Sequence, residues 1–157
     1  MQSAKESDVA TRWQIEPVNW NSPTAEYLKA IRLQVFVEEQ GFSQEEEFDQ
    51  FDEEAYHVLA LDPQGKPCGT GRLYRDLLHP GSARIGRMAV LSQARRTGCG
   101  RAIVRHLIAE AKKRGFRRIV LSAQEHAIGF YQRQGFTPTG PHYLDTHVLH
   151  QDMVLYL

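Results

Sequence analysis

The chain has 157 residues, no formal net charge at pH 7 and an ordinary share of apolar and charged residues, as expected for one soluble globular domain. No apolar run is long enough to span a membrane, and the N-terminal residues lack the basic-then-apolar order of a secretion signal, so we expect a cytoplasmic protein that makes no membrane contact. Residues 1–11 read as a flexible tail and residues 12–157 as a single domain. The only two cysteines, Cys68 and Cys99, are too few for a disulfide scaffold and predict reduced thiols.

The zero net charge hides two segregated runs. Residues 38–54 contain nine acidic residues and no basic one, whereas residues 84–118 contain eleven Lys or Arg and a single acid, Glu110. Each run could be no more than a solvated face. Together they also suit an enzyme that joins a polyanionic cofactor to a cationic acceptor, because segregated charge steers ligands.

The first half predicts one helix among antiparallel strands. Residues 12–19 alternate as a strand, and Pro17 makes it an edge strand or one that ends early. Ser22-Pro23 reads as the N-cap and first residue of a helix that ends near Gly41, and residues 43–54 as part helix, part loop. Three strands follow, at 55–61, 68–74 and 83–91, joined by short turns; glycines 69 and 71 suggest a bulge in the second.

In the second half of the chain, predicted helices alternate with strands. Residues 100–114 form an amphipathic helix pattern closed by Gly115. A short apolar strand at 119–121 should run parallel to 83–91, because a helix lies between them. A short helix at 127–134 and two strands from 136 to 157 complete an α/β (α+β) chain. The prediction is a mixed, mostly antiparallel sheet of six to seven strands, flanked by about four helices.

The segment from Arg95 to Arg101, with the sequence RRTGCGR, connects the third of these strands directly to the amphipathic helix. Glycine at 98 and 100 lets the backbone approach a ligand closely, and the free N–H groups of a first helical turn favour an anion. With Arg95, Arg96 and Arg101 beside them, the anion indicated is a pyrophosphate. A P-loop would need Lys-Ser/Thr after Gly100, and a dinucleotide fingerprint would need glycine at Ile103, so neither fits.

Two motifs together resemble the GNAT superfamily of N-acetyltransferases. Arg95, Gly98 and Gly100 match its Arg/Gln-x-x-Gly-x-Gly/Ala loop, and residues 127–136 match its Ala-x-x-Phe-Tyr-x-x-x-Gly-Phe signature, with Phe130 and Tyr131 in place. The resemblance covers nearly the whole chain. Residues 35–40 and the Ala123-Gln124 pair are most similar to the ElaA/YjcF-like branch.

The resemblance implies the GNAT fold, with a central parallel pair of strands that splay apart around acetyl-coenzyme A as cosubstrate. It implies that Tyr131 is the general acid that protonates the departing thiolate, after an amine attacks the thioester in a ternary complex. The implied cofactor-binding residues are Met88, Ala89, Val90, Arg95, Arg96, Thr97, Gly98, Cys99, Gly100, Arg101, Gln124 and Phe130.

The general base stays open at this stage. Many relatives carry a glutamate where this chain has Gly86, and the candidates include Glu38, Glu39, His126, His142 or a chain of water molecules. Cys99 sits at a variable position of the loop, which favours packing over an acyl-cysteine role.

The pattern of His142, Asp145, His147 and His150 does not favour a metal site, because residues 147 and 150 would fall on opposite strand faces. We expect a small-molecule or peptide amine acceptor, cationic in character, no nucleic-acid partner, and either a monomer or a homodimer. The alternative function is a non-catalytic module that senses acyl-coenzyme A.

Overall fold

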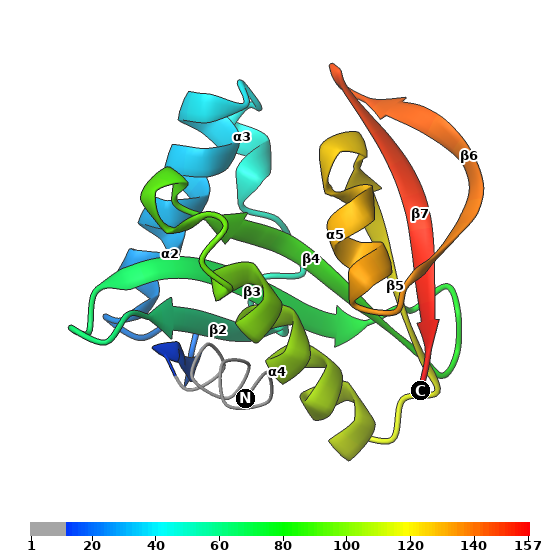
Figure 1. The fold of residues 1–157 in the computed structure, drawn as a ribbon, viewed down its shortest axis with the longest axis horizontal. Coiled ribbons are helices and arrows are strands. Elements are labelled where there is room, and N and C mark those ends of the chain that lie inside the picture. The colour runs from blue at the N-terminus through cyan, green and yellow to red at the C-terminus, as the bar shows by residue number, and fades with distance from the viewer. Residues whose placement is uncertain (1–11) are drawn as a thin grey trace, which may run out of the picture.

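The computed structural model describes residues 12–157, so the predicted tail at 1–11 lies outside the described residues. Its centre is one seven-stranded sheet in the order β1-β2-β3-β4-β5-β7-β6 (Figure 1). The mixed α/β architecture and the strand count agree with the prediction. The strands are β1 Gln14–Val18, β2 Tyr56–Leu61, β3 Pro67–Arg75, β4 Ser82–Val90, β5 Arg118–Gln124, β6 Thr137–Asp145 and β7 Val148–Tyr156.

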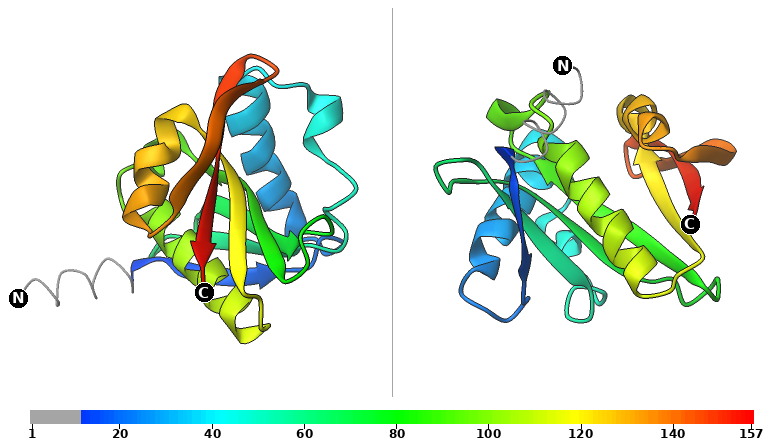
Figure 2. Two further views of the ribbon diagram at one scale, coloured as in Figure 1. Left: turned by 90° about the vertical axis from the view of Figure 1, so that its right-hand side faces the viewer. Right: turned by 60° about the horizontal axis from the view of Figure 1, so that its bottom comes forward.

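Helices cover both faces of the sheet (Figure 2). One apolar cluster packs α4 against the strands and includes Ile103 and Leu107 of that helix, whereas a second cluster packs Leu28 and Ile31 of α2 against the opposite face. No helix in the described part of the chain combines the length and apolar character that crossing a bilayer needs. The helices are α2 Ala25–Arg32, α3 Gln44–Glu47, α4 Cys99–Lys113 and α5 Ile128–Arg133, with 3-10 turns at Ser92–Ala94 (η2) and Glu125–Ala127 (η3).

The first four strands form an antiparallel meander. Pro17 lies in β1, which is an edge strand as predicted, so its missing N–H removes no bond from the interior of the sheet. The two glycines of β3 have a packing reason. A Cβ at Gly69 would lie 3.0 Å from Cys99 Sγ, and one at Gly71 would lie 2.9 Å from Ile103 Cγ2 and 2.7 Å from Met88 Sδ. Bare glycine backbone therefore lets α4 settle directly onto the sheet.

The predicted parallel pair is confirmed, and it is short. β4 and β5 are paired only from Ser82↔Arg118 to Arg84↔Val120. Beyond Arg84 the two strands diverge, as Figures 1 and 2 show, while β5 continues to pair with β7 up to Gln124. The sheet is thereby split into two arms, β1–β4 and β5–β7–β6, with a gap between them.

The first helix departs from the prediction at both ends. Ser22 does not cap it: the hydroxyl of Ser22 donates to Asn19 O, and α2 begins at Ala25 after Thr24. The segment after Arg32 widens into a π-helix, η1 Leu33–Glu39, in which Gln40 N–H bonds Val35 O. Such widened turns are frequent at functional sites. Here the widened segment carries Phe36, Glu39 and Gln40 to the mouth of the gap between β4 and β5.

Candidate active site

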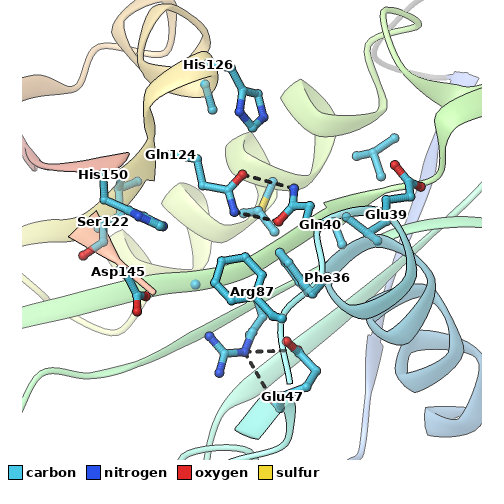
Figure 3. A pocket seen from close by; sticks show the side chains of 18 of the residues that line it. Phe36, Glu39, Gln40, Glu47, Arg87, Ser122, Gln124, His126, Asp145 and His150 are labelled. Atoms are coloured by element: carbon cyan, nitrogen blue, oxygen red, sulfur yellow. Dashed lines mark hydrogen bonds and ion pairs between the residues drawn. The ribbon is translucent and has the colours of Figure 1, made fainter. Parts of the chain in front are cut away.

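A cleft of about 540 Å³ occupies the gap where β4 and β5 diverge (Figure 3). The first arm contributes residues 85–90 of β4, η1 adds Phe36 and Glu39, and Gln40 follows directly after η1. The second arm contributes Leu121, Ser122 and Gln124 of β5, Tyr131 of α5 and His150 of β7. Because the sheet itself is open here, the cleft reaches both of its faces.

The loop that precedes α4 has the conformation that its glycines predict. Gly98, the N-cap residue, has φ +89°, which a residue with a Cβ adopts only at a cost, and Arg96 also lies in the left-handed region at φ +63°. The first intrahelical bond of the loop joins Ala102 N–H to Gly98 O, and no side chain caps the helix. The N–H groups of Cys99, Gly100 and Arg101 are therefore left without helical partners at the positive end of the helix dipole.

Two hydrogen bonds hold this loop in place. The Thr97 hydroxyl donates to Ala94 O, and the Trp13 indole N–H donates to Thr97 O across 3.2 Å. The position of Gly100 has a further reason, because a Cβ there would lie 3.4 Å from Phe130 Cζ. The two sequence motifs, the loop and the Phe130-Tyr131 pair, therefore lie close together.

The three arginines of the loop differ in what they bind. Arg95 is bonded within the protein: its Nε donates to Val90 O at 3.0 Å and its Nη2 donates to the Glu39 carboxylate at 2.7 Å. Arg96 is exposed, and neither it nor Arg101 forms an ion pair with any residue from 12 to 157. Two guanidinium groups beside the open helix terminus are therefore available to an anion.

A β-bulge shapes the wall of the cleft in β4. Register between β3 and β4 shifts between Thr70 and Arg72, so that Arg87 and Met88 together oppose Gly71. Arg87 has φ +50°, as a bulged residue can. The bulge reverses the alternation of side chains, since Ile85 belongs to the core under α4 while Ala89 belongs to the core under α2. Residues 88–90 then border the gap with no strand beside them on the β5 side.

Tyr131 lies on α5 with its ring in the apolar core and is 8% exposed. Its ring packs edge-on against those of Phe130 and Phe136. The Tyr131 hydroxyl forms no hydrogen bond with residues 12–157. Within that range, Arg72 Nε is the only side-chain nitrogen or oxygen that is both unpaired and fully enclosed. The unpaired Tyr131 oxygen must therefore be partly accessible. The hydroxyl therefore opens onto the cleft that Tyr131 lines. Burial raises the pKa of Tyr131 above its ordinary value, so the phenol is protonated at neutral pH.

Cys99 is an interior residue. It is 1% exposed and packs on Gly69, and burial raises the pKa of Cys99 to about 12. A thiol with that pKa is not a nucleophile at neutral pH, despite its place at a helix N-terminus. Packing, the interpretation that the sequence favoured, fits these observations.

Gln124 reaches across the cleft to Gln40. Gln124 Nε2 donates to Gln40 Oε1 at 2.8 Å and Gln40 Nε2 donates to Gln124 Oε1 at 3.1 Å, so the two amides join η1 to β5 (Figure 3). The β6–β7 turn supports the same bridge, because the His147 ring bonds the backbone oxygen of Gln40 and packs on Phe42.

The acidic run is less available than its sequence suggests. Asp52 and Glu47 bind the buried Arg32, Asp49 and Asp52 bind Arg72, and Glu47 also pairs with Arg87 at the floor of the cleft. Burial raises the pKa of Glu47 above its usual range, and the neighbouring arginines only partly oppose this. These three acids are structural charges. The acids left to the cleft are Glu39, Glu46 and Asp145.

Sequence reasoning missed part of the site. Ser122, Arg87 and Phe36 line the cleft without having been singled out, and His150 was weighed only as a metal ligand. The one available signal was their spacing along strands and helix, which cannot show that β4 and β5 part. Among residues 12–157, no three His, Cys, Asp or Glu side chains gather as they would around a metal ion.

The family described as the Acetyltransferase (GNAT) domain matches residues 22–157. The chain belongs to this family. The match includes the loop, the splayed strands and the helix that carries Phe130 and Tyr131.

Individual proteins give the same result. The Bacillus subtilis protein "Uncharacterized N-acetyltransferase YjcF" is 33% identical over 125 residues, 79% of this chain and 86% of that protein. A solved Lactobacillus plantarum protein assigned as an N-acetyltransferase superposes with a TM-score of 0.82 at 26% identity, covering 92% and 98% of the two chains. Escherichia coli ElaA, at 23% identity, shares the fold with a TM-score of 0.77 over 90% of this chain and 97% of its own. The expected ElaA/YjcF-like resemblance is confirmed.

Proposed function

We propose that this GNAT enzyme transfers an acetyl group from acetyl-coenzyme A to a primary amine on a small molecule or peptide, by direct attack in a ternary complex. The carrying observation is that Arg95 of the loop before α4 and Tyr131 of α5 line one cleft, while the N–H groups at the start of that helix have no helical partners. An anion-binding terminus beside a protonated phenol fits a polyphosphate ligand whose other end is a thioester.

The residues of the loop fit the pyrophosphate. The N–H groups from Arg96 to Arg101 would bond its oxygens, Gly98 and Gly100 would let it approach the backbone, and the Arg96 and Arg101 guanidinium groups would offset its charge. Residues 88–90 would bond the pantetheine amides as an added strand, since the edge of β4 is free there. Phe130 and Gln124 would border the same ligand from the second arm.

Tyr131 would act at the sulfur. Attack by the amine on the carbonyl carbon forms the C–N bond and breaks the C–S bond, so a thiolate must be protonated as it leaves. The buried phenol carries its proton at neutral pH, and no other protein group within residues 12–157 engages the hydroxyl. Such a proton transfer contributes about 10²- to 10⁴-fold to a rate.

We propose that the acceptor is cationic, and this rests on the acids that line the cleft, not on the whole acidic run at residues 38–54. Glu46 and Asp145 line the cleft, and neither forms an ion pair with residues 12–157. Glu39 would join them once Arg95 turned toward phosphate. The buried, unbridged Cys68 and Cys99 fit a reducing compartment such as the cytoplasm.

Release of free thiol from acetyl-coenzyme A, followed across a panel of polyamines, amino acids, aminoglycosides and lysine peptides, tests the proposal. Calorimetric titration with coenzyme A tests the binding half independently. We expect binding with acceptor-dependent thiol release. Binding without transfer to any amine would instead support a non-catalytic acyl-coenzyme A module, and absence of binding would reject both.

A further inference from the structure

His150 is the buried titratable residue of the cleft that the reaction above does not use. It lies in β7 directly opposite Gln124 of β5, is 7% exposed and lines the cleft. Figure 3 shows its ring projecting toward the cavity beside Gln124. The ring of Tyr143 from β6 stacks behind it, with centroids 6.0 Å apart and planes inclined by 21°.

The hydrogen bonding of His150 decides which ring nitrogen carries the proton. Its Nδ1 lies 2.9 Å from Val148 O, and because a carbonyl oxygen can only accept, Nδ1 must donate. In the neutral ring Nε2 then holds a lone pair. Nε2 bonds nothing within residues 12–157 and is not among the fully enclosed atoms, so the lone pair is open to the cleft.

His150 and Tyr131 approach the cleft from opposite faces of the sheet. Tyr131 shares the core under α4 with Leu121, whereas Gln124 and its cross-strand partner His150 alternate to the other face. An acyl donor seated at the start of α4 presents one side of its carbonyl to the second face. An amine that enters from the second face meets His150.

The carboxylates around the cleft leave this role open. Gly86 supplies no side chain, Glu47 is paired with Arg32 and Arg87, and Glu39 and Glu46 are exposed. His126 and Asp145 are exposed, and neither forms a hydrogen bond or ion pair with His150. Of the cleft's side chains, His150 alone combines burial with a fixed tautomer and an open lone pair.

We propose that His150 is the general base of the transfer, an assignment that rests on the proposed function. Its Nε2 takes one proton from the ammonium of the acceptor, and the freed lone pair on nitrogen attacks the thioester carbonyl. The C–S electron pair goes to sulfur, which takes the Tyr131 proton. A second N–H proton, made acidic by the new C–N bond, restores Tyr131, and His150 returns its own to solvent. The products are an amide, a free thiol and one proton.

The test compares two nucleophiles in the full-length enzyme. His150→Gln keeps an N–H for Val148 O but cannot accept a proton. With the best alkyl amine of the panel, we expect it to lower kcat about 10²-fold. With hydroxylamine, which is largely unprotonated at pH 7, we expect less than about a threefold loss, because no ammonium has to be deprotonated. His142→Gln is the matched control and should leave both rates unchanged, because this candidate from the sequence lies at an exposed position of β6 that does not line the cleft.

Two results would overturn the assignment. The first, given an active wild-type enzyme, is that kcat of His150→Gln falls equally with both nucleophiles or does not fall with either. The other is a ¹⁵N NMR spectrum of the wild-type protein that places the proton of neutral His150 on Nε2. A wild-type enzyme that transfers to neither nucleophile rejects the proposed function itself, and the assignment with it.

Discussion

Arg95 binds Val90 O and the Glu39 carboxylate at the same time, so one side chain of the loop before α4 covers the free edge of β4 and neutralises an acid of the cleft. A pantetheine amide that bonds Val90 O would compete with Arg95 for the free edge of β4, and a displaced Arg95 would leave Glu39 unpaired. In the proposed function, seating of the cofactor and exposure of an acid to the acceptor would therefore be coupled.

Glu39→Gln tests that coupling. Removing the pair should tighten coenzyme A binding, because Arg95 no longer has a partner to leave. The ion pair between Arg95 and Glu39 is partly exposed and worth at most about 1 kcal/mol, so we expect the Kd for coenzyme A to fall about two- to fivefold. Titration calorimetry measures it, with Glu45→Gln on the exposed face of α3 as control. Weaker binding in Glu39→Gln would show that this acid helps to hold the cofactor instead.

Tyr131→Phe separates chemistry from binding. The ring keeps its packing against Phe130 and Phe136, so coenzyme A affinity should change by less than about twofold. The turnover number should fall by about 10²-fold, since the departing sulfur loses its proton donor. Steady-state kinetics beside calorimetry measure both quantities. Unchanged turnover would remove Tyr131 from the mechanism.

Gly98→Ala and Gly65→Ala form a matched pair. Both glycines have φ above +80°, at +89° and +81°, and a Cβ at Gly65 would contact nothing within 4 Å. Each substitution should cost about 1–2 kcal/mol of unfolding free energy. Only Gly98→Ala should also weaken coenzyme A binding, by about tenfold or more, because it alone distorts the loop. Equal affinities in the two variants would argue against a phosphate seat at α4.

Asp52 is predicted to be the most costly carboxylate to remove. Burial alone would raise its pKa, but the hydrogen-bonded Arg32 and the charge of Arg72 hold the pKa below its usual value. Asp52→Ala leaves two buried guanidinium groups short of a partner and should lose about 3–5 kcal/mol. Glu45→Gln should stay within about 0.5 kcal/mol. Urea unfolding measures both variants, and a loss below about 1 kcal/mol for Asp52→Ala would contradict the prediction.

His57 should make the fold sensitive to mild acid. Its ring is 1% exposed and donates from Nε2 to Asp52 O, and burial lowers the pKa of His57 below its ordinary value. Below pH ~6.5 the unfolded chain binds a proton that the folded protein does not, so the unfolding free energy falls as pH falls. The limit is about 1.4 kcal/mol per pH unit for one group.

His57→Gln should remove that part of the slope between about pH 6.5 and 5. The lowered pKa of His106 acts in the same sense and stays in both proteins. Glu47, whose raised pKa favours its protonated form in the folded state, acts in the opposite sense above pH ~4.5 and is likewise common to both. Unfolding midpoints across this pH range give the difference directly. Parallel slopes would contradict the prediction.

The sequence by itself determined whatever is local. Alternation and helical periodicity located the elements to within a few residues, except where α2 widened into a π-helix after Arg32, a change that no local propensity encodes. The Gly98 conformation and the open helix terminus follow from residues 95–101 alone, because a loop and the helix it opens are contiguous in the chain.

Only the tertiary structure decided how the site closes. Three features depend on segments that are far apart in the chain. The β4–β5 pairing ends at Arg84↔Val120, Gln40 bonds Gln124, and Asp52 and Glu47 form ion pairs with the buried Arg32. The same is true of His150. This residue lies in β7, but in the proposed role its Nε2 lone pair faces the cleft between β4 and β5. Residue order fixes which groups exist, whereas packing fixes which of them remain free to act.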